Sequence, residues 1–482
     1  MTGACCDRPF VFPERRYRLP IEFGPGGWMS WISIAAAAAI ATVPYNAADE
    51  VAARAWIAKA GHRFDAAATS PADLAPLVKR LAGARVIGIG EATHGTHQDE
   101  AFKAELIKAL VRAGTIDTVA IECNRAAGYG FDRYVRFGEG DPAALIRSPN
   151  FFSIWRNDAF GGLLLWLRAW NQKADKPIRV VGIDNQSTGV DASVALAFLS
   201  RHDSQTAVRL RDAMQALLPN ANGTPVFLYD WIAKSDRATF DAIFKAAGEL
   251  ETRLADAPAG WRDDPDYSEA TYAAKVARQG LFEFDHEYKG ADKKFDEAEY
   301  YSRRDVFMAA NLVERIGDGR TALWAHDNHV ASAFSAADEQ AGWRNLGWSI
   351  KAKLKGGYQT VGFTWSRATL NVVNLPDAAR NPSVETRVYS DVPLRNDRPG
   401  ELGHLFSALP GEAWWIDMRT RPHSAALDRW AARPAWRGWA GWRVDPANWQ
   451  KKNDGGAQAP DRGFDVIVWF RTMSPARVWP GR

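Results

Sequence analysis

Cysteine is scarce in this sequence, with 3 residues in a chain of 482. Cys5 and Cys6 lie in an N-terminal stretch that we expect to be removed, which leaves Cys123 as the single thiol of the mature chain. A single cysteine excludes a disulfide framework, and a chain of this length can bury a large core without one. Cys123 follows an apolar stretch and has no second cysteine nearby, so we interpret it as a buried structural thiol rather than a nucleophile.

The sequence also lacks an excess of charge of either sign. Its 60 basic residues stand against 57 acidic residues, so the formal net charge is +3 at pH 7. We find no basic cluster with aromatic residues between its members, and we therefore expect no nucleic-acid partner. The hydrophobic fraction of 46% and the charged fraction of 24% are those of a folded globular protein. Nothing in the sequence indicates an oligomeric state.

Only one long apolar run is present, from Trp28 to Val43. It is shorter than a comfortable membrane span and has the length of the hydrophobic part of a signal peptide. Ala39-Ile40-Ala41 fits a cleavage site for small residues, and basic residues lie upstream. These are Arg15, Arg16 and Arg18. We expect residues 1–41 to be removed and the mature chain to be periplasmic or secreted, without a stable membrane span. The alternatives are a buried Ala-rich helix or a true start at Met29.

Short apolar runs alternate with helical patterns along the rest of the chain, which predicts an α/β fold. The expected strands are Val86–Ile89, Thr118–Ile121, Ile178–Ile183, Thr321–Ala325, Thr360–Trp365, Ala413–Asp417 and Asp465–Phe470. A helical pattern connects the first two strands, so we expect a mixed, mainly parallel sheet with helices on both faces. We predict one domain over residues 48–482, in which residues 200–317 form a helical insertion that covers an active-site cleft.

Four of these strands run directly into an ionisable residue, and the carboxyl ends of parallel strands share one edge of a sheet. The four residues are Glu91, Glu122, Asp184 and His326. Other candidates lie close to them in the sequence: His94, His97 and Lys103 after the first strand, Asp158 on a later helix, and His329 three residues after His326. Because residues far apart in sequence would converge on one crevice, we predict an enzyme rather than a structural protein.

Two chemistries are open to these residues. In the first, a histidine acts as general base on a water molecule that attacks a carbonyl carbon, with a carboxylate fixing its tautomer. The sequence has no G-x-S-x-G elbow at a strand end, so direct attack by water is favoured over a covalent serine or cysteine intermediate. In the second, the pairs His94/His97 and His326/His329, together with Glu91 and Glu122, bind zinc or manganese. Spacing alone does not decide between them.

Several sequence blocks together resemble the erythromycin esterase family. The most specific block is GEATHGTHQDEAFK, and four others follow in the expected order: AIECN, WRNDAFGGLLLWLRAWN leading to VVGIDNQ, RRDVFMAANL leading to WAHDNHV, and FDVIVWFRTMSPAR. The resemblance covers Ala84 to Arg477. It implies a carboxylic-ester hydrolase without a metal cofactor, acting on a small-molecule ester or lactone, which in the best-known members is the macrolide lactone.

The resemblance also implies roles for individual residues. His94 would be the general base, positioned together with its water by Glu91 and Glu122, and His326 would assist at the carbonyl or the leaving group. Lys103 stands where the family tends to have Arg, which keeps the charge but loses a bidentate contact. Apart from the resemblance, we predict that His97, Asp158, Asp184 and His329 contact the substrate. Asp158 and Asp327 replace the usual Glu and Asn, so the natural ester is left open. A metal-dependent hydrolase and a non-catalytic periplasmic binding protein are the alternatives.

Overall fold

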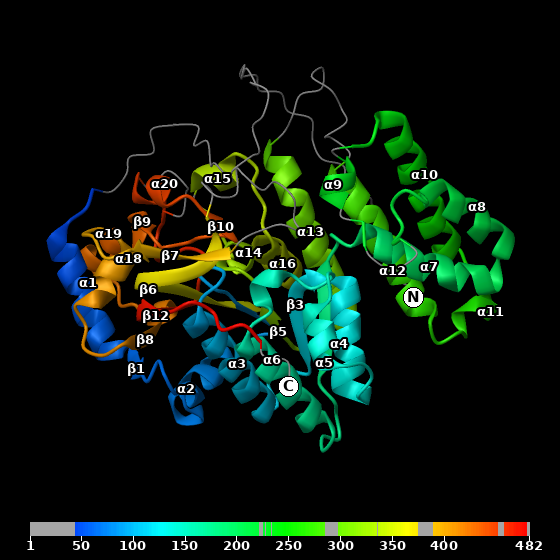
Figure 1. The fold of residues 1–482 in the computed structure, drawn as a ribbon. Helices are drawn as coiled ribbons and strands as arrows, with labels where there is room; N and C mark the ends of the chain where they lie inside the picture. The colour runs from blue at the N-terminus through cyan, green and yellow to red at the C-terminus, as the bar shows by residue number, and fades with distance from the viewer. Residues whose placement is uncertain are drawn as a thin grey trace, which may run out of the picture.

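The computed structural model describes residues 44–479, apart from 221–224, 227, 233, 285–296, 335, 375–388 and 452–456. The expected signal segment, residues 1–41, lies outside the described residues. A sheet with helices on both of its faces organises the molecule (Figure 1). No helix among the described residues is both long and apolar enough to cross a membrane.

Six parallel strands form the centre of the sheet. In spatial order they are β12 (Val466–Met473), β6 (Tyr358–Asn374), β2 (Val86–Ile89), β5 (Thr321–Trp324), β3 (Thr118–Asn124) and β4 (Arg179–Asp184). All four residues of β2 are buried, as expected for a parallel strand that is covered on both faces and therefore apolar throughout. The expected mixed, mainly parallel sheet is confirmed.

Further strands extend this centre. Beyond β12, β8 (Ala413–Asp417) pairs antiparallel with β12, and β1 (His62–Phe64) pairs antiparallel with β8. The long β6 also pairs with β7 (Tyr389–Arg395), which is antiparallel to it, and with β10 (Arg443–Val444), which is parallel to it. A separate two-stranded sheet contains β9 (Ala435–Trp436) and β11 (Ala457–Gln458). All seven expected strands are present. β1 was not among the expected strands, because three residues with a distant partner in β8 leave no periodic pattern.

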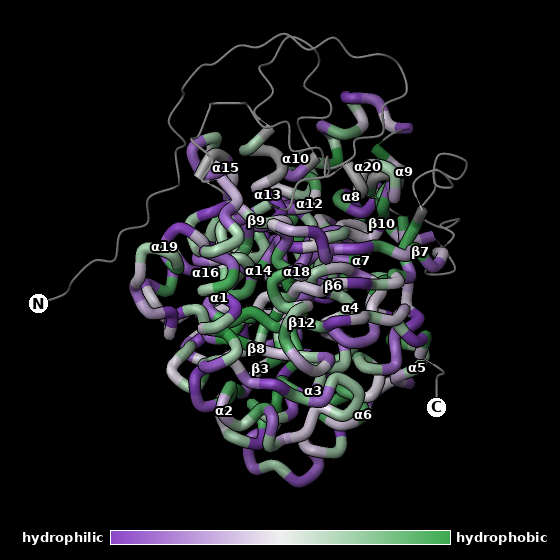
Figure 2. The backbone as a smooth tube through the Cα atoms, turned by 90° about the vertical axis from the view of Figure 1, so that its left-hand side faces the viewer, coloured by the Kyte–Doolittle hydropathy of each residue, from purple (hydrophilic) through white to green (hydrophobic). Residues whose placement is uncertain are grey.

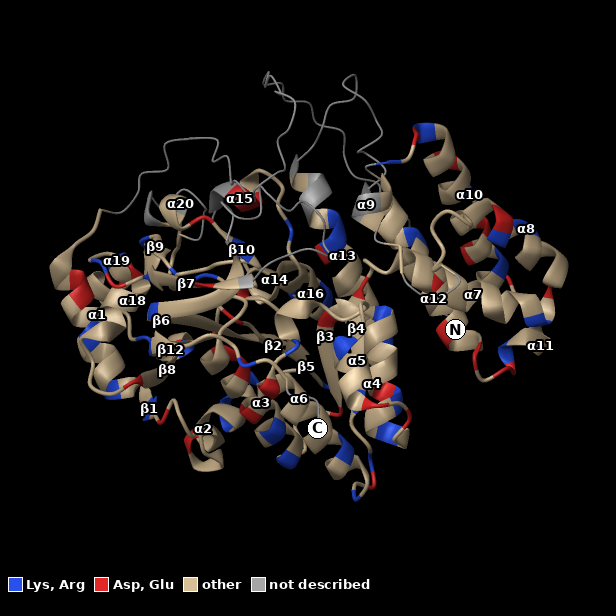
Figure 3. Cartoon of the chain, in the orientation of Figure 1, with Lys and Arg blue, Asp and Glu red and all other residues tan. Residues whose placement is uncertain are grey.

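Two hydrophobic cores lie on opposite faces of the sheet, because alternate residues of a strand point to opposite sides. One face carries α2 (Pro71–Leu81), α3 (His97–Arg112), α4 (Arg125–Phe137), α5 (Pro142–Arg147) and α6 (Asp158–Asn171). The other carries α1 (Ala47–Ala60), α13 (Glu297–Ile316), α16 (Leu346–Leu354), α18 (Leu402–Ser407) and α19 (Ala425–Ala432). Figure 2 shows hydrophobic residues gathered along the strands, and Figure 3 shows both signs of charge spread over the outer helices.

A third core belongs to a group of helices beside β4, at the edge of the sheet (Figure 1). These are α7 (Thr188–His202), α8 (Ser204–Met214), α9 (Leu228–Ile232), α10 (Arg237–Ala255), α11 (Ala259–Arg262) and α12 (Tyr267–Phe284). The hydroxyl of Tyr272 donates a hydrogen bond of 3.3 Å to the carbonyl oxygen of Gly182, which ties α12 to β4. The described part of 200–317 is free of strands, as expected, but its helical group begins at Thr188. That it covers a cleft stays a prediction.

The remaining elements are short. They are α14 (Asp327–Val330), α15 (Ala336–Gln340), α20 (Pro446–Lys451) and the 3₁₀ helices η1 (Ser153–Trp155) and η4 (Met418–Thr420). Two of them matter for the site, because α14 directly follows the carboxyl end of β5 and η1 carries Trp155 next to the loop after β2.

Candidate active site

The four strand-end residues meet at one edge of the sheet, as the sequence predicts. Glu91 follows β2, His326 follows β5, and Asp184 is the last residue of β4. Glu122 differs slightly, because β3 continues beyond it to Asn124. All four are buried, with at most 6% of their surface exposed. Gly90 leaves room beside β2 for Asp327, since a Cβ atom at position 90 would overlap the carboxylate of Asp327.

Glu91 and His94 form a hydrogen-bonded pair in the loop after β2. Nδ1 of His94 contacts Oε1 of Glu91. Burial by itself raises the pKa of Glu91, but the charge of Lys103 and the hydrogen bond from His94 hold it well below its usual range, so Glu91 is ionised. A carboxylate only accepts hydrogen bonds, so Nδ1 of His94 carries the hydrogen and Nε2 is left with a lone pair. This is the arrangement of a general base. The loop also turns through Gly95, at φ +78°.

Lys103 contacts the carboxylate oxygen of Glu91 that His94 does not contact. Its side chain is fully buried, its Nζ donates to Oε2 of Glu91, and Nζ lies 4.1 Å from the ring centroid of Trp324. Glu100 is 3.9 Å from Nζ, but burial and the charge of Glu91 raise its pKa well above the ordinary value. Glu91 is therefore the ionised partner of Lys103. In this position Lys103 contacts the carboxylate and has no exposed surface.

His326 lies beside His94, with 4.7 Å between the ring centroids. The backbone N–H of Asn328 donates to Nδ1 of His326 at 3.1 Å, and Nε2 donates to the carbonyl oxygen of Ala440 at 3.0 Å. Burial and the neighbouring His94 lower the pKa of His326 to about 3, so the ring is neutral. Both ring nitrogens are thus engaged by backbone groups. Donation to a substrate would require the bond to Ala440 to open.

A network of charges surrounds Glu122. Arg304 donates to Glu122 at 3.0 Å and to both oxygens of Asp184 at 2.6 and 3.1 Å. His329 lies between two carboxylates, with Nε2 3.0 Å from Glu122 and Nδ1 2.8 Å from Asp305. The backbone N–H of His326 donates to the other oxygen of Glu122. Asp184 and His329 are therefore partners of this network.

His329 is a poor metal ligand in this arrangement. Burial lowers its pKa, but the charges of Asp305 and Glu122 outweigh burial and raise it to about 10. The ring is then an imidazolium, whose two N–H groups leave no lone pair for an ion. Among the described residues, no group of three or more His, Cys, Asp or Glu side chains is arranged to hold a metal ion. The donor set therefore does not fit the alternative of a paired-histidine metal site.

His97 and Asp158 form a separate pair. Nδ1 of His97 lies 3.6 Å from Oδ1 of Asp158, and their side chains are 22% and 31% exposed. Their backbone N–H groups donate to the carbonyl oxygens of Ser474 and Arg477. The two residues begin helices α3 and α6 and take no part in the hydrogen bonds of Glu91. The structure thus divides the nine predicted residues into a cluster of seven and this separate pair. Six residues of the cluster are buried, and the side chain of the seventh, His329, is 15% exposed.

Three residues of the cluster were not predicted from the sequence. Arg304 and Asp305 lie in the block RRDVFMAANL, and the position of this block just before the strand that leads to the two site histidines was a signal for both. Trp155 gave no such signal, because one Trp among 21 cannot be distinguished by spacing. Its indole Nε1 donates to Glu91 at 3.0 and 3.2 Å.

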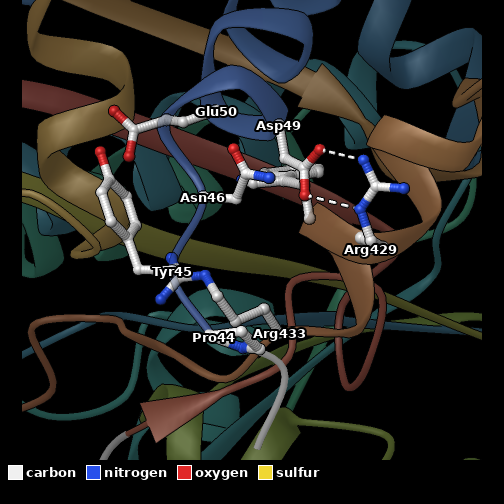
Figure 4. Close-up of a pocket in the computed structure, with 8 residues that line it drawn as sticks. Pro44, Tyr45, Asn46, Asp49, Glu50, Arg429 and Arg433 are labelled. Carbon is white, nitrogen blue, oxygen red and sulfur yellow. Dashed lines mark hydrogen bonds and ion pairs between the residues drawn. The ribbon is translucent and has the colours of Figure 1, made fainter.

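A shallow hollow, with no room for a ligand, lies elsewhere, between α1 and α19 (Figure 4). Asp49 and Arg429 face each other across it with two hydrogen bonds of 2.6 and 3.0 Å. Its lining includes none of the strand-end residues. We therefore place the functional site at the sheet edge and not in this hollow.

Two curated relatives resemble parts of the chain. The putative hydrolase YbfO of Bacillus subtilis (strain 168) is 28% identical over 144 residues, which are 29% of this chain and 30% of the relative. Erythromycin esterase type I of Escherichia coli is 24% identical over 112 residues, 23% of this chain and 27% of the relative. The matched stretches thus span less than a third of each relative.

Solved structures share the fold over most of the chain. A Bacillus cereus protein has a TM-score of 0.73 at 19% identity, and a succinoglycan biosynthesis protein has 0.71 at 16%; each match covers 90% of this chain and 100% of the other. A mutant of the erythromycin esterase EreC, in its open conformation, has a TM-score of 0.62 at 16% identity, over 85% of this chain and 96% of that one. The erythromycin esterase family matches residues 114–473. This chain belongs to the erythromycin esterase family.

Proposed function

We propose that this protein is a hydrolase that cleaves a small-molecule ester or lactone with a water molecule activated by His94. Family membership and relatives described as a putative hydrolase and an erythromycin esterase support a hydrolase. The observation that carries the proposal is the contact between His94 and Glu91, because it directs the lone pair of the imidazole to Nε2.

In the proposed reaction, Nε2 of His94 takes a proton from water while the water oxygen bonds to the carbonyl carbon. The electron pair of the C=O bond moves onto its oxygen, which gives a tetrahedral intermediate. The C–O bond to the alcohol then breaks as the carbonyl re-forms, and the imidazolium returns its proton to the departing alkoxide. The products are an acid and an alcohol. Glu91 stabilises the imidazolium throughout.

We propose that the seven clustered residues form the reaction centre and that His97 and Asp158 lie at its rim. Asp184 and His329 hold Glu122 through Arg304 and direct contact, so their effect on a substrate is indirect. His97 and Asp158 keep polar atoms partly exposed and are the better candidates for substrate contact. Cys123 is fully buried, and burial raises the pKa of its thiol well above the ordinary value, which argues against a thiolate nucleophile.

We also propose that the reaction is independent of a metal ion, because Glu122 and Asp305 engage both ring nitrogens of His329. The test is mass-spectrometric detection of water addition to a panel of macrolides, simple esters and lactones, with metal content measured on the same preparation. Turnover that persists in chelator supports the proposal. Turnover that disappears in chelator and returns with one added divalent metal would overturn the metal-free mechanism. Binding of a panel member without any turnover would instead support a binding protein.

A further inference from the structure

We propose that Trp155 is a positioning residue for the general base: its indole N–H fixes the carboxylate of Glu91, and Glu91 in turn fixes the tautomer of His94. The inference rests on the proposed function for its kinetic consequences. It follows from contacts that neither the sequence nor the family relationship assigns to this tryptophan.

The contacts of Trp155 are directed at both partners of the dyad. Nε1 lies 3.0 Å from Oε1 and 3.2 Å from Oε2 of Glu91, so one hydrogen is shared between the two carboxylate oxygens. The indole ring also meets the imidazole of His94 edge to face, with 5.8 Å between centroids and 78° between planes. The Trp155 side chain is fully buried. One side chain thus touches the carboxylate and the base together.

The shared hydrogen bond restricts rotation of the carboxylate. Oε1 of Glu91 accepts from His94 and Trp155, and Oε2 accepts from Lys103 and Trp155. A donor placed between the two oxygens keeps both in the plane that suits the other two donors. Trp155 does this without a charge, whereas Lys103 supplies the positive charge that keeps Glu91 ionised. The two residues therefore contribute different things: Lys103 sets the ionisation of Glu91, and Trp155 sets its orientation.

Trp155 is itself held firmly. It packs against Phe151 and Phe152, with centroid distances of 6.4 and 6.1 Å. The next residue, Arg156, donates to the carbonyl oxygens of Ser148 and Phe151 at 2.9 Å each. A donor with so little freedom can hold a carboxylate more precisely than a flexible side chain, because less conformational entropy is lost in keeping it there.

The test compares Trp155→Phe with wild type and with Trp170→Phe as a matched control. Trp170 is a partly buried tryptophan on α6 that stacks on Trp166 and does not touch the dyad. The first readout is the ¹⁵N spectrum of the His94 ring, which reports the tautomer and needs no substrate. The second is steady-state kinetics on an ester identified from the panel. If Trp155→Phe does not fold, benzothienylalanine at position 155 replaces the N–H by sulfur at nearly the same shape.

We expect hydrogen at Nδ1 of His94 in wild type and in Trp170→Phe, and a mixture of tautomers when the indole N–H is removed. The kcat should fall by about 10-fold to 100-fold, from the loss of a correctly oriented base, with KM changed less than about twofold. An unchanged tautomer together with an unchanged kcat would overturn the inference. If wild type hydrolyses no ester, the proposed function fails, but the ¹⁵N spectra still decide the role of Trp155.

Discussion

Nδ1 of His94 and Oε1 of Glu91, three residues apart in the loop after β2, are joined by a buried hydrogen bond between side chains that are 9% and 0% exposed. Lys103 and Trp155 complete the shell of donors around Glu91. A carboxylate that is fully satisfied in this way stays ionised and fixed, which is what a histidine base needs from its partner.

Replacing Glu91 by Gln tests the partner of the base. The Glu91→Gln side chain keeps nearly the same volume but loses the charge that orients His94 and stabilises its protonated form. We expect kcat to fall by about 10²-fold to 10⁴-fold, the range for loss of general-base catalysis. Initial rates on the identified ester check this, and a decrease of less than about threefold would contradict the role given to Glu91.

Replacing Lys103 by Met tests the buried ion pair. Lys103 and Glu91 are both fully buried, so Lys103→Met leaves a buried carboxylate without its countercharge. We expect the free energy of unfolding to fall by about 3–5 kcal/mol, the usual effect of removing one partner of a buried pair. Urea denaturation measures it. The control is Lys108→Met, because Lys108 forms a partly exposed pair with Glu105 on the same helix and should change stability by less than about 1 kcal/mol.

We expect His329 to make the free energy of unfolding decrease as the pH rises. Its folded-state pKa of about 10 lies above the ordinary value of 6.5, so the folded protein binds more protons than the unfolded chain between these two values. The contribution of His329 is therefore fully present below pH 6.5 and is lost as pH rises towards 10, with a slope of at most about 1.4 kcal/mol per pH unit. Unfolding curves from pH 6.5 to 10 should show this slope in wild type and a weaker one in His329→Gln. Equal slopes would contradict the protonated state.

Cys123→Ala should leave activity almost unchanged, because the thiol is buried and its pKa is raised well above the ordinary value. In the folded protein we expect no alkylation by iodoacetamide, and rapid alkylation in urea. Mass spectrometry of the peptide that contains Cys123 measures alkylation under both conditions. A loss of kcat beyond tenfold in Cys123→Ala would revive a thiol nucleophile.

The sequence was sufficient to predict the strands that position the site, because their buried apolar runs end at ionisable residues. Val86–Ile89 and Ala413–Asp417 were predicted to the residue. The sequence did not predict which partners each side chain contacts. Lys103 pairs with Glu91 in the core, and His329 lies between two carboxylates. Spacing shows which residues are close, whereas tautomers and protonation depend on partners such as Trp155 and Asp305 that come from distant segments.

The most direct test of the account is the turnover of metal-free enzyme with His94 intact and with His94→Gln. The control is His423→Gln, because the side chain of His423 is 89% exposed and His423 is not among the candidate site residues. We predict that wild type and His423→Gln add water to the ester equally fast in chelator, and that His94→Gln is slower by about 10²-fold to 10⁴-fold with its fold retained. Turnover by His94→Gln within about threefold of wild type would contradict the central claim that His94 activates the water.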